Sequence, residues 1–230
     1  MALEYPEHTD QHIGDLAAAL AATCALVFSL SPEEWGLPTP CVEWDVTELV
    51  RHLVRGNLSV GRQLAGGDEA FLRGAVGRSV DGAPRSSAAG ADDAPPRPSL
   101  AETLERTGTD LLHAYTAPGA LDRIVILPAG NVPGVVAARI RTVDVIVHGW
   151  DIGAATGRSY DVDHEVAERA LAFTVRSIGS LSNDHRPFAP PVAVASGAPL
   201  ADRLAGLLGR EVPWVPPGDR QNDGTGNTED

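Results

Sequence analysis

The 230-residue sequence contains no lysine, and arginine supplies all 18 of its basic side chains. The absence of lysine excludes Schiff-base chemistry and a lysine general base. Two cysteines, Cys24 and Cys41, are too few for a disulfide framework or for a zinc site made of cysteines alone. The sequence also has no Gly-rich phosphate loop, Gly-x-Ser-x-Gly elbow or Cys-x-x-Cys pair, which argues against nucleotide-binding, serine-hydrolase and dithiol redox functions.

Acidic residues outnumber basic ones, and the formal net charge is −13. Nucleic acids and anionic membranes bind basic patches, so neither is expected as a partner. The first residues, MALEYPEHTD, are acidic, unlike the start of a signal peptide, and the apolar run LAAALAATCALVFSL is shorter than a membrane span. We therefore expect a cytoplasmic protein with a small-molecule substrate. The sequence does not indicate the oligomeric state.

Apolar periodicity and capping residues predict a mainly α protein. Hydrophobic residues make up 43% of the chain, enough for a sizeable core. Helices are expected over about residues 11–30, 45–64, 99–116, 135–156 and 163–181, and in the segment PLADRLAGLLGR, which Gly209 closes. A short capped turn is expected at SPEEWG, and a short strand or extended piece before Pro128.

The helix expected at 135–156 has an alternative, because its segment TVDVIVHGW is rich in β-branched residues and alone favours a strand. In either structure Asp144 and His148 share a face, since they are four residues apart. Two further segments, residues 74–98 and 216–230, are rich in Gly, Asp and other polar or small residues. We expect a long surface loop, either functional or disordered, at 74–98 and a disordered tail at 216–230.

An aspartate and a histidine interrupt one of the most apolar runs of the chain, RTVDVIVHGWDIGAATG. In a helix, Asp144 and His148 would present two metal ligands from one turn. His52 lies beside the apolar stripe of the helix at 45–64 and is the candidate third ligand. Three such ligands leave a coordination position open for water or substrate. The charge of the cation would also offset the free-energy cost of burying the carboxylate. The alternative is a structural hydrogen-bonded pair.

Three segments resemble one known family. LPTPCVEWDVTELVRHLVRGN and PGVVAARIRTVDVIVHGWDIGAATGR are similar to the two signatures of the mycothiol-dependent maleylpyruvate isomerase family, within the DinB-like superfamily. FAPPVAVASGAPLADRLAGLLGREVPW resembles the short ending of a subgroup described only as metal-binding. The resemblance covers the chain up to about Trp214. It is specific for the superfamily and not for a reaction.

The resemblance implies a DinB-like four-helix bundle with a central divalent metal, usually zinc, held by His52, Asp144 and His148. Residues 1–160 would form this bundle, and residues 161–215 a short helical C-terminal extension packed on it. Many relatives have Glu or His in place of Asp144, whose shorter side chain would draw the metal toward its own helix. Some relatives bring mycothiol to the metal, so mycothiol is a candidate cosubstrate here.

Further residues are candidates for supporting roles. Asp151 is a candidate hydrogen-bond acceptor for a ligating imidazole. Arg55 and Arg141 are candidates to hold a substrate carboxylate, and Asn57 and Trp150 to line the substrate cavity. The alternative for the arginines and Asn57 is a solvated or structural role, which is favoured, and for Trp150 it is packing in the core. For Cys41, packing within its loop is favoured over a place near the metal. Structural roles are favoured for the remaining candidates, Cys24, Trp44, His113, His164 and His185.

These observations lead to one main functional hypothesis and two alternatives. The leading one is a metal-dependent enzyme that uses a low-molecular-weight thiol for isomerisation or thiol transfer on a small metabolite. The first alternative is a thiol-free metal-dependent hydrolase or lyase acting in secondary metabolism. The second is a non-catalytic metal-binding protein.

Overall fold

The structure is a computed structural model that describes residues 11–66, 99–128, 130–178 and 188–217. Its elements are, in chain order, α1 (Gln11–Phe28), η1 (Pro32–Gly36), α2 (Val46–Leu64), α4 (Leu100–Tyr115), β1 (Ile124–Leu127), β2 (Gly130–Pro133), α5 (Gly134–Thr156), α6 (His164–Ile178) and α7 (Leu200–Leu207). They confirm the predicted mainly α fold. Some predicted features lie outside the described residues: the loop at 74–98, the helix end at 179–181, His185 and the tail from residue 218.

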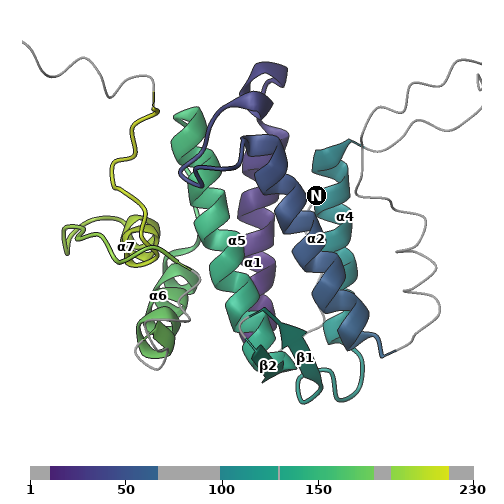
Figure 1. The fold of residues 1–230 in the computed structure, drawn as a ribbon. Coiled ribbons are helices and arrows are strands. Elements are labelled where there is room, and N and C mark those ends of the chain that lie inside the picture. The colour runs from purple at the N-terminus through teal and green to yellow at the C-terminus, as the bar shows by residue number, and fades with distance from the viewer. Residues whose placement is uncertain (1–10, 67–98, 129, 179–187, 218–230) are drawn as a thin grey trace, which may run out of the picture.

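Four helices, α1, α2, α4 and α5, form a bundle. Helix α1 packs against α5 and α4, and α2 packs against α4 and α5, so each helix has two neighbours. Helices α6 and α7 pack against each other and against α5, on the side away from α4 (Figure 1). The described part of the predicted C-terminal extension thus lies against the bundle through α5. The domain boundary near residue 160 stays a prediction.

Capping residues mark the helix boundaries as the sequence pattern predicts. The Asp45 carboxylate accepts a hydrogen bond from the backbone N–H of Glu48 at 2.8 Å, before the first turn of α2. At the start of α4, the Ser99 hydroxyl and the Glu102 carboxylate each accept from the other residue's backbone N–H. Gly157 ends α5 with a φ of 66°, a conformation that glycine adopts without strain.

The extended piece before Pro128 is one half of an antiparallel hairpin. Strand β1 pairs with β2, in register Ile124 to Pro133, at the end of the bundle shown at the bottom of Figure 1. The second strand was not predicted. Its sequence GNVP contains glycine and proline, both of which are depleted in strands, so local propensity gave no signal for it.

Helix α5 is the central element of the fold. Its residues from Arg141 to Gly153 are buried with the exception of Asp144, so it is covered on nearly all sides. Packing by α1, α2, α6 and α7 therefore overrides the strand preference of its β-branched residues. The strand alternative for TVDVIVHGW is wrong for this reason.

Helix α1 is long and apolar enough to span a membrane by length and composition alone. Half of the residues in that window are buried inside the fold, including Leu16, Leu20 and Val27. Core helices of soluble proteins pass the same test, and here α1 contributes to the core against α4 and α5.

The close packing of α5 leads to a stability prediction at Gly149. A Cβ atom there would lie 2.8 Å from Thr23 Oγ1 and closer still to the Tyr160 ring. We expect Gly149→Ala to lower the free energy of unfolding by about 1–3 kcal/mol, because the overpacking outweighs the better helix propensity of alanine. Urea unfolding followed by circular dichroism measures this.

Gly14 is the matched control, since it is also helical but a Cβ atom at its position would have no neighbouring atom within 4 Å. Gly14→Ala is expected to raise stability by about 0.5–1 kcal/mol. Equal effects of the two substitutions would contradict the close packing at Gly149.

Candidate metal centre

The three predicted metal ligands come together where α2 faces α5. His52 Nε2 lies 3.4 Å from Asp144 Oδ1, and His148 Nε2 lies 3.3 Å from the same oxygen. One ligand atom from each residue lies within 4.8 Å of the other two. The His52 and Asp144 side chains are 33% and 28% exposed, so solvent reaches one side of this cluster.

A second carboxylate sets the orientation of the His148 ring. His148 Nδ1 lies 3.0 Å from Asp151 Oδ2, and Asp151 is fully buried. Because an ionised carboxylate only accepts hydrogen bonds, Nδ1 carries the proton and donates it to Asp151. In the neutral ring the Nε2 lone pair then faces Asp144, and only a proton or a cation makes that approach favourable. This is the arrangement typical of a metal-ligating histidine.

The electrostatics of the cluster agree with this geometry. Burial lowers the pKa of His148, but the negative charge of Asp144 and hydrogen bonds to Asp144, Asp151 and Cys41 outweigh it and raise the pKa well above its ordinary value. Burial likewise raises the pKa of Asp144, and the charges of Arg141 and His148 outweigh it and hold that pKa well below its ordinary value. Both pKa shifts favour a proton between His148 Nε2 and the Asp144 carboxylate when no metal is bound.

Arg141 holds the far oxygen of Asp144. Its Nη1 donates to Asp144 Oδ2, its Nη2 donates to the Leu53 carbonyl, and its Nε lies 3.1 Å from Asn57 Oδ1. Asn57 in turn donates to Thr107 Oγ1 on α4 at 3.4 Å. Arg141 and Asn57 are buried and use these polar groups on the protein itself, so they fix Asp144 in place. Their predicted contacts with a substrate remain untested.

An arginine from beyond α7 completes the support of the cluster. Arg210 Nη2 lies 2.9 Å from Asp151 Oδ2, and Arg210 Nε lies 3.2 Å from Asp151 Oδ1. Burial raises the pKa of Asp151, while the hydrogen bonds and charges of His148 and Arg210 lower it below its ordinary value. Asp151 is thus a buried anion held between an imidazole and a guanidinium.

Cys41 lies beside this ion pair and not only within its own loop. Its Sγ is 3.3 Å from Asp151 Oδ2, 3.3 Å from Arg210 Nη2 and 4.0 Å from His148 Nδ1. The preference for simple loop packing at Cys41 is therefore wrong, because the loop before α2 folds back over α5. Cys41, His148 and Asp151 form a second group of potential ligand atoms on the other side of the His148 ring.

The other candidates lie in different surroundings. Trp44 packs on His52, with ring centroids 4.8 Å apart, and covers the cluster from the loop side. The Trp150 indole N–H donates to Asp202 Oδ1 on α7 at 2.7 Å, so its polar contact is with the C-terminal extension. Arg55 is exposed on α2, one turn after His52. The substrate-binding roles of Trp150 and Arg55 stay predictions.

The buried ion pair leads to a prediction at Arg210. We expect Arg210→Met to lower the free energy of unfolding by about 3 kcal/mol, because it leaves Asp151 buried without its cation. Chemical denaturation of the metal-free protein measures this. Arg158→Met is the matched control, since Arg158 makes a similar bidentate contact with Glu34 in an exposed setting. This substitution should lower the free energy of unfolding much less. Equal losses in the two variants would contradict the role of burial.

Comparison with known proteins identifies the family. The family model of the mycothiol maleylpyruvate isomerase N-terminal domain matches residues 16–153, which include His52, Asp144, His148 and Asp151. Two uncharacterized proteins of Mycobacterium tuberculosis, from strains CDC 1551 / Oshkosh and ATCC 25618 / H37Rv, are each 34% identical over 193 residues, covering 83% of this chain and 93% of the relative. No solved structure shows a significant match. The chain therefore belongs to the mycothiol maleylpyruvate isomerase N-terminal domain family.

Proposed function

We propose that this protein is a divalent-metal-dependent enzyme that uses a low-molecular-weight thiol such as mycothiol to isomerise a small metabolite or to transfer the thiol to it. The observation that carries the proposal is the approach of His52 Nε2 and His148 Nε2 to one oxygen of Asp144, on the solvent-facing side of the cluster. Membership of a family named for a mycothiol-dependent isomerase supports the thiol.

The donor set fits a divalent cation, and zinc is the expected metal. Two imidazole nitrogens and one carboxylate oxygen are ligands that zinc takes in catalytic sites, where a further position stays open. A bound ion would act as a Lewis acid and lower the pKa of a thiol or water at that position. The ligands proposed to hold it are His52, Asp144 and His148.

The remaining residues would position these ligands and the substrate. Asp151 keeps the His148 proton on Nδ1, which leaves Nε2 free for the cation. Arg141 holds Asp144 Oδ2 and leaves Oδ1 toward the imidazoles. Because Arg141 is occupied, exposed Arg55 is the better placed of the two arginines to contact a substrate carboxylate.

Metal binding is the first test. Protein stripped with a chelator and titrated with Zn²⁺ in a calorimeter should bind one equivalent at the cluster. His52→Ala and His148→Ala should each weaken binding by more than about 100-fold, since each removes a ligand and not merely its support. His164→Ala, at an exposed position on α6, is the matched control and should leave the affinity for Zn²⁺ unchanged. Equal affinities in all variants would refute the site.

Thiol binding separates the leading hypothesis from its alternatives. Mycothiol should stabilise the zinc-loaded protein in a thermal-shift assay, by about 2.7 kcal/mol at a hundred times its dissociation constant. S-methylated mycothiol, and mycothiol added to the His148→Ala variant, should give a much smaller shift. Metal binding without any response to thiols would favour thiol-free metal chemistry or a non-catalytic role.

The raised pKa of His148 predicts that metal binding releases a proton. Below this pKa, protons occupy Nε2 and compete with the metal, so apparent affinity should fall about tenfold for each unit of decreasing pH. At pH 7, calorimetry in two buffers of different ionisation enthalpy should show release of about one proton per ion. Binding without proton release at this pH would mean that His148 is already neutral in the metal-free protein.

A further inference from the structure

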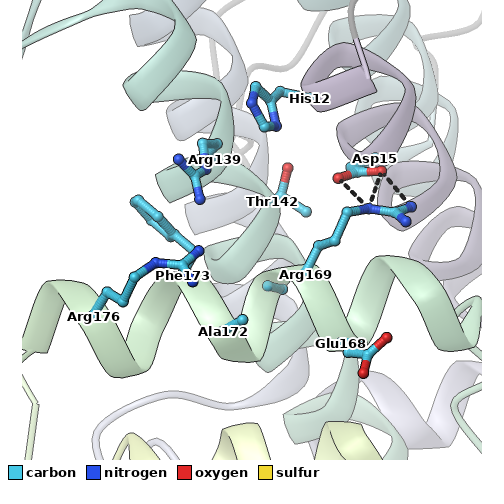
Figure 2. Close-up of a pocket in the computed structure, with 10 residues that line it drawn as sticks. His12, Asp15, Arg139, Thr142, Glu168, Arg169, Ala172, Phe173 and Arg176 are labelled. Atoms are coloured by element: carbon cyan, nitrogen blue, oxygen red, sulfur yellow. Dashed lines mark hydrogen bonds and ion pairs between the residues drawn. The ribbon is translucent and has the colours of Figure 1, made fainter.

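A separate cavity of about 420 Å³ lies between α1, α5 and α6 (Figure 2). Its size falls within the range of small-molecule sites, roughly 300–1,000 Å³. Helix α5 contributes Arg139 and Thr142 to its wall. At about 100° per residue, these positions lie on nearly the opposite face of α5 from Asp144 and His148. The cavity is therefore distinct from the metal cluster.

The cavity gathers positive charge in a strongly acidic protein. Three arginines line it, of which Arg169 is engaged by Asp15, with Nη2 to Oδ1 at 2.8 Å, and by Glu165 at 3.1 Å. Within the described part of the chain, Arg139 and Arg176 form no ion pair. Among the described residues, these two cations thus have no carboxylate paired with them, in a chain whose net charge of −13 would otherwise repel anions.

An aromatic ring holds one of these cations in place. The Arg139 guanidinium carbon lies 4.2 Å from the centre of the Phe173 ring. Stacking uses the face of the guanidinium and leaves N–H groups at its edge to donate hydrogen bonds. Figure 2 shows Arg139 and Arg176 toward the Phe173 end of the cavity, whereas Glu168, which also lines the cavity, lies toward the opposite end.

The two cations also disfavour each other. Burial lowers the pKa of Arg139, and the charge of Arg176 lowers it further, against a smaller opposite effect of Asp15. An anion bound between the two guanidinium groups would offset this repulsion. The rest of the wall includes Phe173, Ala170 and Ala172, which offer apolar surface to the body of a ligand.

We propose that this cavity binds a small organic carboxylate, held at its charged end by Arg139 and Arg176 and packed through its apolar part against Phe173 and Ala172. A guanidinium matches the planar geometry of a carboxylate and can donate two hydrogen bonds to it. The site is independent of the metal cluster and of the proposed reaction.

Calorimetric titration of the chelator-treated full chain with benzoate tests the proposal. Benzoate should bind, and its neutral isostere benzamide should bind at least about tenfold more weakly, because it lacks the charge. Inorganic phosphate, which carries charge without an apolar body, should also bind more weakly. Equal binding of benzamide, or tighter binding of phosphate, would overturn the assignment.

Matched variants locate the site. Arg139→Gln/Arg176→Gln should weaken benzoate binding by at least about tenfold. Arg62→Gln/Arg203→Gln removes the same charge elsewhere and should leave binding unchanged. His148→Ala should also bind benzoate normally, and a loss there would place the ligand at the metal cluster instead. Unchanged binding in the first double variant would overturn the proposal, and circular dichroism verifies that each variant is folded.

Discussion

The approach of two imidazole nitrogens to one carboxylate oxygen is the interaction on which the centre depends. His52 and His148 both direct Nε2 to Asp144 Oδ1, at 3.4 and 3.3 Å. Because His148 Nδ1 donates to Asp151, its Nε2 can lie this close to the carboxylate only with positive charge between them. In the metal-free protein that charge is a proton on His148, whose raised pKa is a direct result of the arrangement. The same geometry that binds a proton so strongly is suited to a divalent cation.

Helix α5 organises the chemistry through its periodicity. Arg141, Asp144, His148 and Asp151 follow one another at intervals of three and four residues, so they form a continuous polar line along one buried face. Each of these four residues has a charged or polar neighbour on that line, and the contacts between neighbours offset the free-energy cost of burying polar groups. The opposite face of α5 carries Arg139 toward the cavity at α6. Helix α5 thus carries two polar surfaces, one at the metal cluster and one at the cavity.

The sequence predicted the elements of the fold that depend on local signals. Capping residues such as Asp45 and the i, i+4 pair Asp144 and His148 are readable from spacing, and the place of His52 beside an apolar helical stripe made it the candidate third ligand, which the resemblance also implied. Local sequence patterns could not predict contacts between segments that are distant in the chain. Arg210 lies 59 residues after Asp151, and nothing in the spacing of its segment links it to that carboxylate; Cys41 reaches the centre because its loop folds over α5. Such partners are set by tertiary packing, which periodicity does not encode.

The pairing of Arg210 with Asp151 has a consequence for the order in which the centre is built. All three candidate ligands lie in the first 148 residues and precede the guanidinium that neutralises Asp151. During synthesis, a nascent chain that has emerged only as far as α6 holds every ligand but not this counter-ion. Asp151, which orients His148, therefore gains its cation only when the segment after α7 docks on α5, and this docking completes the charge balance of the centre.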